Sequence, residues 1–354
     1  MKFRSNRQAF FVERKKGLEM KVLRRICWVF CCCALMWQLG TSSPAAEGSH
    51  TYFSSGLALM TEGGLEAPEG SVRAELEQLQ KRTGLAIGIF NYQGIGLLIF
   101  QKRSFAFHKL LFDGNATVGA VSRDGTEIAL TQPLTKRSSV VIVHPDGSDL
   151  REYEGIRANS LMCWSYGNSE LVVGTPGPKL QLLELKSKLV RELQVEDLSD
   201  EQILTSQCWS PDGKQIVYES RDQNVLLYNF EKNSPTKLAK GTEPTWSPDG
   251  NWIAYRDGDT YFAIHPSGEG RKKLFHKTRA VSGLYWSPDS RFVAYVHQDF
   301  LALDAEFYHL IVRRLEDGSE AWVADGAEAG AGYNYQWVAN PQLLEQFESA
   351  TASR

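Results

Sequence analysis

The sequence predicts an all-β fold built from repeated four-stranded units, and two observations predict it. The first is a ten-residue stretch, WSPDGNWIAY, which begins at Trp246 and recurs closely at Trp209 and Trp286. The second is its spacing. With looser copies at Val121 and Trp164, the serine of each copy falls at 122, 165, 210, 247 and 287, in steps of 43, 45, 37 and 40 residues. A period of about 40–45 residues is that of one four-stranded β-propeller blade.

The amino end of the chain predicts an export signal over residues 1–46. Lys21, Arg24 and Arg25 precede an apolar run from Ile26 to Leu39, and small residues follow it. This order is typical of a cleavable signal, and Met20 is an alternative start that would give it a conventional length. The run is shorter than the roughly 20 residues that span a bilayer. An uncleaved short anchor is the alternative.

Residues 47–84 are predicted to form a linker followed by a short helix. The first part is rich in Gly, Ser and Glu without a lasting period, which is typical of a linker. A helix is expected from Ser71 to Arg82, with Ser71 as its N-cap and Gly84 at its carboxyl end. We expect its apolar face to pack on the main domain, residues 85–354; a partner-binding helix is the alternative.

The repeated Ser-Pro-Asp-Gly predicts a tight turn between two strands. Pro presets φ for the second turn position, Asp bonds to nearby backbone, and Gly accepts a positive φ. We therefore assign a structural role to the turn residues Asp124, Asp212, Gly213, Asp249, Gly250 and Asp289.

Two further strands follow each copy, so that each repeat is expected to form one blade. A degenerate sixth copy of the repeat is expected near the end of the sequence, with strands at 335–338 and 342–347. The amino-terminal strands 95–100 and 105–112 would complete it, so that both chain ends close the ring and leave no open edge. The sequence thus predicts six blades, with five or seven as alternatives.

These copies resemble the TolB-like repeat, also called PD40 and similar to WD40, over roughly residues 95–347. The copies at 121 and 164 depart from the pattern, because Val121 and Arg123 replace Trp and Pro, and Tyr166-Gly167-Asn168 replaces Pro-Asp-Gly. The resemblance implies a propeller, and it implies a structural turn rather than catalytic residues. Only about 40 residues separate the expected cleavage site from the first strand, which favours a stand-alone propeller over TolB itself, a periplasmic protein with a preceding α/β domain.

The charge of the chain limits the class of partner. The first 46 residues hold nine Lys or Arg and two Glu, out of 39 basic and 42 acidic residues in all, which leaves 30 basic and 40 acidic residues and a net charge of −10. An acidic body argues against nucleic acid, whose phosphates require cationic patches. Membrane contact is expected only through an uncleaved signal.

No familiar motif for catalysis, cofactor or metal binding occurs in the sequence. His144 and His265 each precede a proline turn and are interpreted as turn residues. Cys163 and Cys208 each precede a repeat Trp and are expected to be buried free thiols, too far apart on neighbouring blades for a disulfide. We therefore expect no cofactor and no metal.

Ligands of propellers usually meet the loops that lead into the inner strands. Here these candidate loops are residues 154–159, 196–207, 241–243, 277–283 and 324–333. The residues selected in or beside these loops as candidate partner contacts are Glu243, Tyr333, Tyr335, Asp197 and Asp200.

The sequence therefore favours an exported, non-catalytic propeller, periplasmic or extracellular in a bacterium, that binds an unidentified protein partner as a scaffold in the cell envelope. The alternative is a metal-dependent propeller enzyme, similar to lyases or lactonases, with its site at the channel mouth.

Overall fold

The computed structural model describes residues 70–345, apart from gaps at 92–93, 101–103, 110–116, 133–138, 146, 157, 159–161, 176–178, 196–204, 278–282, 302–304, 326–333 and 343. The expected export signal and linker lie outside these residues. Helix α2 (Val72–Thr83) precedes all the strands. Within the described residues, no helix has the length and apolar character needed to cross a membrane.

The strands form antiparallel sheets, numbered here along the chain. Sheet 1 contains β4 (Thr117–Val121), β5 (Ile128–Gln132), β6 (Ser139–Val143) and β7 (Arg151–Glu154). Sheet 2 contains β8 (Met162–Trp164), β9 (Glu170–Thr175), β10 (Lys179–Glu184) and β11 (Leu189–Leu193). Sheet 3 contains β12 (Gln215–Glu219), β13 (Asn224–Asn229) and β14 (Ser234–Lys240).

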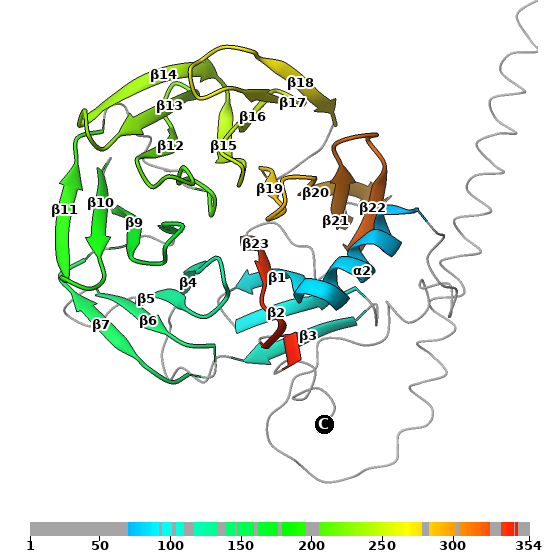
Figure 1. Cartoon of the computed structure of the whole chain (residues 1–354), viewed down its shortest axis with the longest axis horizontal. Helices are drawn as coiled ribbons and strands as arrows, with labels where there is room; N and C mark the ends of the chain where they lie inside the picture. Colours follow the sequence, from blue (N-terminus) through cyan, green and yellow to red (C-terminus); the bar gives the residue numbers. More distant parts are fainter. Residues whose placement is uncertain are drawn as a thin grey trace, which may run out of the picture. The chain divides into compact units, whose positions relative to one another are not determined.

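The carboxyl half repeats the same order of strands. Sheet 4 contains β15 (Thr242–Trp246), β16 (Ile253–Asp257), β17 (Thr260–Ile264) and β18 (Lys272–His276). Sheet 5 contains β19 (Tyr285–Trp286), β20 (Phe292–Leu301), β21 (Ala305–Arg314) and β22 (Glu320–Asp325). Within the compact unit of residues 62–354, Figure 1 shows these sheets following one another around a ring, with β4, β15 and β19 on its inner side.

The last sheet, called the terminal sheet below, combines strands from both ends of the described chain. Its order is β23 (Asn334–Ala339), β1 (Leu85–Asn91), β2 (Gly94–Ile99) and β3 (Ser104–Lys109). β23 pairs antiparallel with β1, with Trp337 opposite Ile87. The predicted strand at 342–347 is wrong where it is described, because a helical turn follows Pro341 and the Leu344 N–H donates to the Asn340 carbonyl at 3.1 Å. Proline suits the first turn of a helix and cannot donate to a strand ladder.

Sheet 3 has three strands where four are predicted. Its inner segment makes a single isolated bridge, from Trp209 to Ile216. The Cys208 carbonyl accepts from the Val217 N–H of β12 at 2.8 Å, but the Cys208 N–H donates to Cys163 Sγ of sheet 2 at 3.0 Å. Because this N–H bonds outside its own sheet, the ladder of sheet 3 stops there. The prediction of six four-stranded blades is therefore wrong: the described residues form five such blades and this three-stranded sheet.

Each repeat turn is built around a buried serine. The Ser247 hydroxyl donates to Asp249 Oδ1 at 2.6 Å and accepts from the Trp252 N–H at 2.9 Å. Gly250, at φ +74°, donates its N–H to the Ser247 carbonyl at 2.9 Å. The equivalent serine-to-aspartate bonds measure 2.6–2.7 Å in the other copies that have the Asp, between Ser122 and Asp124, Ser210 and Asp212, and Ser287 and Asp289. One side chain thus pairs groups that would otherwise be unsatisfied beside the core.

The divergent copy keeps this arrangement without an aspartate. Ser165 Oγ still accepts from the Glu170 N–H at 3.1 Å, and Asn168 donates its N–H to the Ser165 carbonyl at 3.2 Å. Asn168 has φ +52°, a conformation that Asn tolerates better than most side chains. The serine, more than the Pro or Asp, is therefore the common requirement of the turn.

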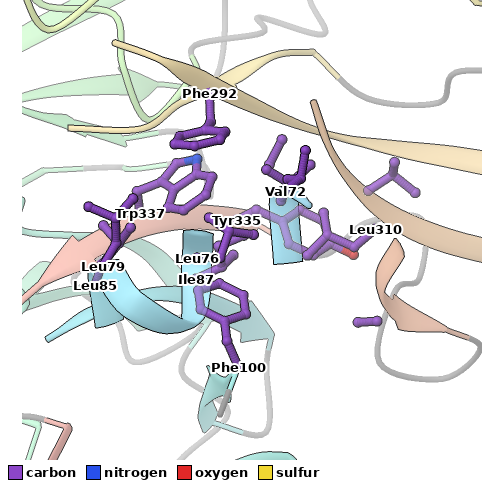
Figure 2. Packing of buried hydrophobic residues seen from close by; sticks show 14 residues of the cluster. Val72, Leu76, Leu79, Leu85, Ile87, Phe100, Phe292, Leu310, Tyr335 and Trp337 are labelled. Carbon is purple, nitrogen blue, oxygen red and sulfur yellow. The ribbon is translucent and has the colours of Figure 1, made fainter. Parts of the chain in front are cut away.

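Helix α2 packs into the core between the terminal sheet and sheet 5. The Ser71 hydroxyl accepts from the Ala74 N–H at 3.2 Å, and Gly84 ends the helix at φ +67°. Its apolar face joins side chains of both sheets in one cluster, shown in Figure 2: Val72, Leu76, Leu79, Ile87, Phe292, Leu310, Tyr335 and Trp337. The apolar face is therefore used inside the domain.

A charged contact fastens the first turn of this helix. Glu75 Oε2 accepts from Arg314 Nε of β21 at 3.1 Å, and Arg291 bonds the other carboxylate oxygen. Arg314 also donates to the Gly70 carbonyl at 3.0 Å.

We expect Ser247→Ala to lower the free energy of unfolding by about 1–3 kcal/mol, because it leaves buried backbone groups without their partner. Chemical denaturation measures this change. Ser267→Ala, in an exposed turn of the same sheet, is the control and is expected to have little effect. Equal losses in the two variants would contradict the role assigned to the buried serine.

Gly84→Ala is expected to destabilise the domain strongly. A Cβ at this position would lie 2.3 Å from the backbone nitrogen of Pro341, which packs against the end of α2. Gly70→Ala is the matched control, since Gly70 also has a positive φ, +77°, but nothing within 4 Å of its Cβ position. A melting temperature lowered no more by Gly84→Ala than by Gly70→Ala would show that this contact does not form.

Candidate interaction face

The ring has two faces with different kinds of connection. The repeat turns lie on one, called the turn face, and neighbouring turns bond to each other there: the Asp249 N–H donates to Ser290 Oγ at 3.1 Å, and Asn340 Nδ2 donates to the Asp124 carbonyl at 2.8 Å. The loops into the inner strands and the turns between second and third strands lie on the opposite edge. We call this edge the connection face. Its segments vary from sheet to sheet, so it is the candidate site.

A short segment of the chain crosses the middle of the ring and contacts three other sheets. Thr205 Oγ1 donates to the Pro244 carbonyl of β15 at 2.8 Å, and Ser206 Oγ donates to the Tyr335 carbonyl of β23 at 3.3 Å. The Gln207 side chain forms two bonds of 2.7 Å with the backbone of Trp286 in β19, donating to the carbonyl and accepting from the N–H. We call residues 205–207 the central segment.

The central segment is largely internal. Gln207 is only 6% exposed, and all its side-chain polar atoms are paired with Trp286. A buried amide with both ends bonded is costly to displace, because each freed backbone group would have to be desolvated alone. At the level of residues 205–207, protein groups inside the ring bond to each other, so ligand contacts are expected at the rim of the ring.

The rim beside sheets 3 and 4 carries a charged cluster. Arg256 Nη2 lies 3.3 Å from Glu243 Oε1, and the Glu243 N–H donates to Glu219 Oε2 at 3.0 Å. The Glu243 side chain is 12% exposed, and its φ of +53° is uncommon for a residue other than Gly. The loop at 241–243 thus holds two carboxylates and one guanidinium close together.

Burial raises the pKa of both carboxyl groups. For Glu243, desolvation is the main cause, the Arg256 charge opposes it and the Glu219 charge adds to it. For Glu219, desolvation again outweighs the Glu243 N–H bond and Arg256. Protonation of these groups is therefore easier in the folded protein than in water.

Exposed charged side chains surround this cluster. Asp222 lies in the turn between β12 and β13, Asp257 ends β16, and Asp259 lies in the turn before β17. The first of these turns meets the loop into β15, because the Gly241 N–H donates to the Gln223 carbonyl at 2.8 Å. Basic residues lie in the same sector: Lys240 precedes Gly241, the Lys277 N–H donates to the Asp259 carbonyl at 2.8 Å, and Arg271 Nη2 lies 3.1 Å from Asp257 Oδ2. This sector of the connection face therefore presents exposed carboxylates among charges of both signs.

The structure separates the residues selected from the sequence. Glu243 lies on the connection face, while Tyr333, Asp197 and Asp200 lie outside the described residues. Tyr335 is 1% exposed and packs edge-on against Tyr285, with ring centroids 5.5 Å apart. Its selection as a partner contact is therefore wrong, because β23 is buried on both faces as an inner strand between neighbouring sheets.

The described residues contain no group of three or more His, Cys, Asp or Glu that could hold a metal ion. His144 and His265 bond within their own turns, to Ser148 Oγ at 3.2 Å and Ser267 Oγ at 2.8 Å.

The two described cysteines are free and completely buried, but they are closer than the sequence suggests. The Cys208 N–H donates to Cys163 Sγ at 3.0 Å, across the boundary between sheets 2 and 3. Trp209 Nε1 also donates to the Cys163 carbonyl, at 3.0 Å, which draws the two segments together. The expectation of two buried free thiols is confirmed, and the two positions lie in direct hydrogen-bond contact.

Sequence reasoning included residues 205–207 in the candidate loop 196–207 but did not predict their bonds to three other sheets. Their only sequence signal is that Thr205, Ser206 and Gln207 are polar although they directly precede the apolar Cys208-Trp209 of an inner strand.

The fold is confirmed by comparison with solved structures. A protein described as putative TolB from Agrobacterium tumefaciens is 16% identical, with a TM-score of 0.52 over 68% of this chain and 88% of that one. TolB from Acinetobacter baumannii is 17% identical, with a TM-score of 0.53 over 73% and 69%. A chain of a nidogen/laminin complex is 8% identical, with a TM-score of 0.51 over 72% and 98%.

At these identities the likeness concerns the fold, and the fold is a propeller of the TolB type. No family model matches the sequence, and no curated protein matches it.

The raised pKa of Glu243 predicts a pH-dependent stability. A carboxyl whose pKa is higher in the folded state stabilises the fold at acidic pH, and this contribution is lost as the pH rises through the raised pKa. We therefore expect the melting temperature of the wild type to fall, relative to that of Glu243→Gln, between about pH 4.5 and neutral pH. Glu231→Gln, exposed on the turn face, is the control. A difference between wild type and Glu243→Gln that is constant over this range would contradict the assignment.

Proposed function

We propose that this chain is an exported propeller that acts as a non-catalytic binding or scaffold module and holds a protein partner on the connection face. The observation that carries the proposal is the contrast between the two faces. On the turn face, the repeated residues bond to each other, whereas the connection face presents exposed charged turns that differ from sheet to sheet.

The solved structures support a role in protein binding. One of the similar chains comes from a complex of nidogen and laminin, so a propeller of this shape takes part in a protein assembly there. Propellers carry their functions in loops grafted on a common scaffold. The proposed binding role therefore depends on the loops of this chain. The similarity to the solved structures supports only the propeller scaffold that carries these loops.

The exposed carboxylates of the connection face support a partner with a basic surface. Asp222, Asp257 and Asp259 are exposed there, next to the carboxylates of Glu219 and Glu243. The predicted acidic loop at 196–202, with Asp197 and Asp200, would add to the same charge. Complementary charge increases the rate of association and disfavours partners of the wrong sign.

The terminal sheet supports closure of the ring by strands from both chain ends. Trp337 Nε1 of β23 donates to the Tyr285 carbonyl of sheet 5 at 2.8 Å. Gln336 Nε2 donates to the Ser122 carbonyl in the first turn of sheet 1, at 3.0 Å. Together with the β1–β23 ladder, these bonds would fix the loops of the connection face relative to each other.

Export rests on the signal expected over residues 1–46, which would place the mature chain, with its linker and helix at 47–84 and its propeller from 85, in the periplasm or outside the cell. The acidic body of the chain gives no support for nucleic acid as a partner.

Charge reversal on the connection face tests the proposal. We expect the double variant Asp222→Lys, Asp259→Lys to lose the protein that the wild type captures from a cell-envelope fraction, and we expect added salt to weaken the wild-type capture, because the contact is between charges. Capture is measured by affinity purification and mass spectrometry.

The matched control is Glu231→Lys, Glu269→Lys, which makes the same change of charge in exposed turns of the same two sheets on the turn face. It should capture the partner as the wild type does. Loss of capture in the control as well, or no specific capture by the wild type, would overturn the proposal.

A further inference from the structure

Two thiols meet at the boundary between sheets 2 and 3. Cys163 lies in β8 and Cys208 lies at the equivalent position before Trp209, and both are 0% exposed. The Cys208 N–H donates to Cys163 Sγ at 3.0 Å. They lie among apolar residues of both sheets, with Val172, Ile216 and Tyr218.

Their separation suits a covalent bond. A backbone nitrogen lies about 1.5 Å from its own Cα, so Cys163 Sγ lies within about 4.5 Å of the Cys208 Cα. Disulfides join residues whose Cα atoms are about 4.4–6.8 Å apart. The contact between the Cys208 N–H and Cys163 Sγ is short enough for rotation of the two side chains to bring their sulfur atoms together. A structural metal has no support here, because such sites need about four ligands and the described residues offer no third one nearby.

We propose that Cys163 and Cys208 are a disulfide site that joins sheets 2 and 3 when the chain folds in the presence of a disulfide oxidant. The bond would close a loop between positions 45 residues apart in the sequence and would link two neighbouring sheets that are otherwise held by packing and a few hydrogen bonds. In the cell, the modification rests on the proposed export, since disulfides persist in oxidising compartments.

The chemistry is thiol–disulfide exchange. The thiolate of one cysteine attacks a sulfur of the oxidant, a small disulfide RSSR, and releases RS⁻. The thiolate of the second cysteine then attacks the mixed disulfide and releases the second RS⁻. Two protein thiols and one RSSR give one protein disulfide and two RSH, so the protein loses two electrons and two protons.

Burial decides when this reaction takes place. An oxidant cannot reach thiols that are 0% exposed, and burial raises the pKa of Cys208, which disfavours the reactive thiolate. We therefore expect the two cysteines to be oxidised during folding, before sheets 2 and 3 pack together. The folded reduced protein should be slow to oxidise, and the folded oxidised protein should be slow to be reduced.

The test uses the full chain with Cys27, Cys31, Cys32 and Cys33 changed to Ser, so that only the two buried cysteines remain. The protein is reduced and unfolded, refolded in a mixture of reduced and oxidised glutathione, and alkylated after acid quenching. Peptide mapping should then find Cys163 and Cys208 joined in one chain, with no free thiol. Folded reduced protein exposed to the same mixture should keep both thiols far longer.

The single variants Cys163→Ser and Cys208→Ser are the controls, and the remaining cysteine should be recovered free or as a glutathione adduct. Circular dichroism follows folding in each sample. Refolded protein with native spectra and both thiols free would overturn the proposal, and so would cysteines joined only between chains. Because these results are obtained in vitro, they are independent of where the chain resides and of whether a partner binds.

Discussion

The arrangement of the inner strands depends on the hydrogen bonds of the central segment, residues 205–207. Successive sheets of a propeller pack side chain against side chain, which leaves little to hold inner strands that are not neighbours. Here Gln207 reaches past β15 to both backbone groups of Trp286, 79 residues away, and Ser206 reaches β23. The Gln207 carbonyl also accepts from the Trp246 N–H of sheet 4 at 2.9 Å.

Because the central segment bonds to three inner strands and the repeat turns bond to each other, the proposed recognition surface is the rim of the connection face. Around sheets 3 and 4 its described part carries exposed carboxylates, and Glu243 is held in a left-handed conformation beside Glu219 and Arg256.

Much of the fold is predictable from the sequence, because each repeat carries its own local chemistry: a buried serine, a turn, and strands with an apolar pattern. The departures come from contacts between residues far apart in the chain. The pairing of Gln207 with Trp286 and the contact of Cys208 with Cys163 have no local signature. Tyr335 is selected as a partner contact although neighbouring sheets bury it, and Pro341 begins a helical turn where an apolar pattern predicts a strand. The candidate site is predicted less accurately than the fold, since the loops lack the repeat that identifies the strands.

Native-state hydrogen exchange of the Trp286 amide tests the central claim most directly, because its N–H donates to the Gln207 side chain at 2.7 Å. If the central segment ties the inner strands, the Trp286 amide exchanges among the slowest in the protein, and Gln207→Ala accelerates it while the Ser122 amide in the turn of sheet 1, two sheets away, keeps its rate. Fast exchange of Trp286 in the wild type, or equal acceleration at both amides, would contradict the account.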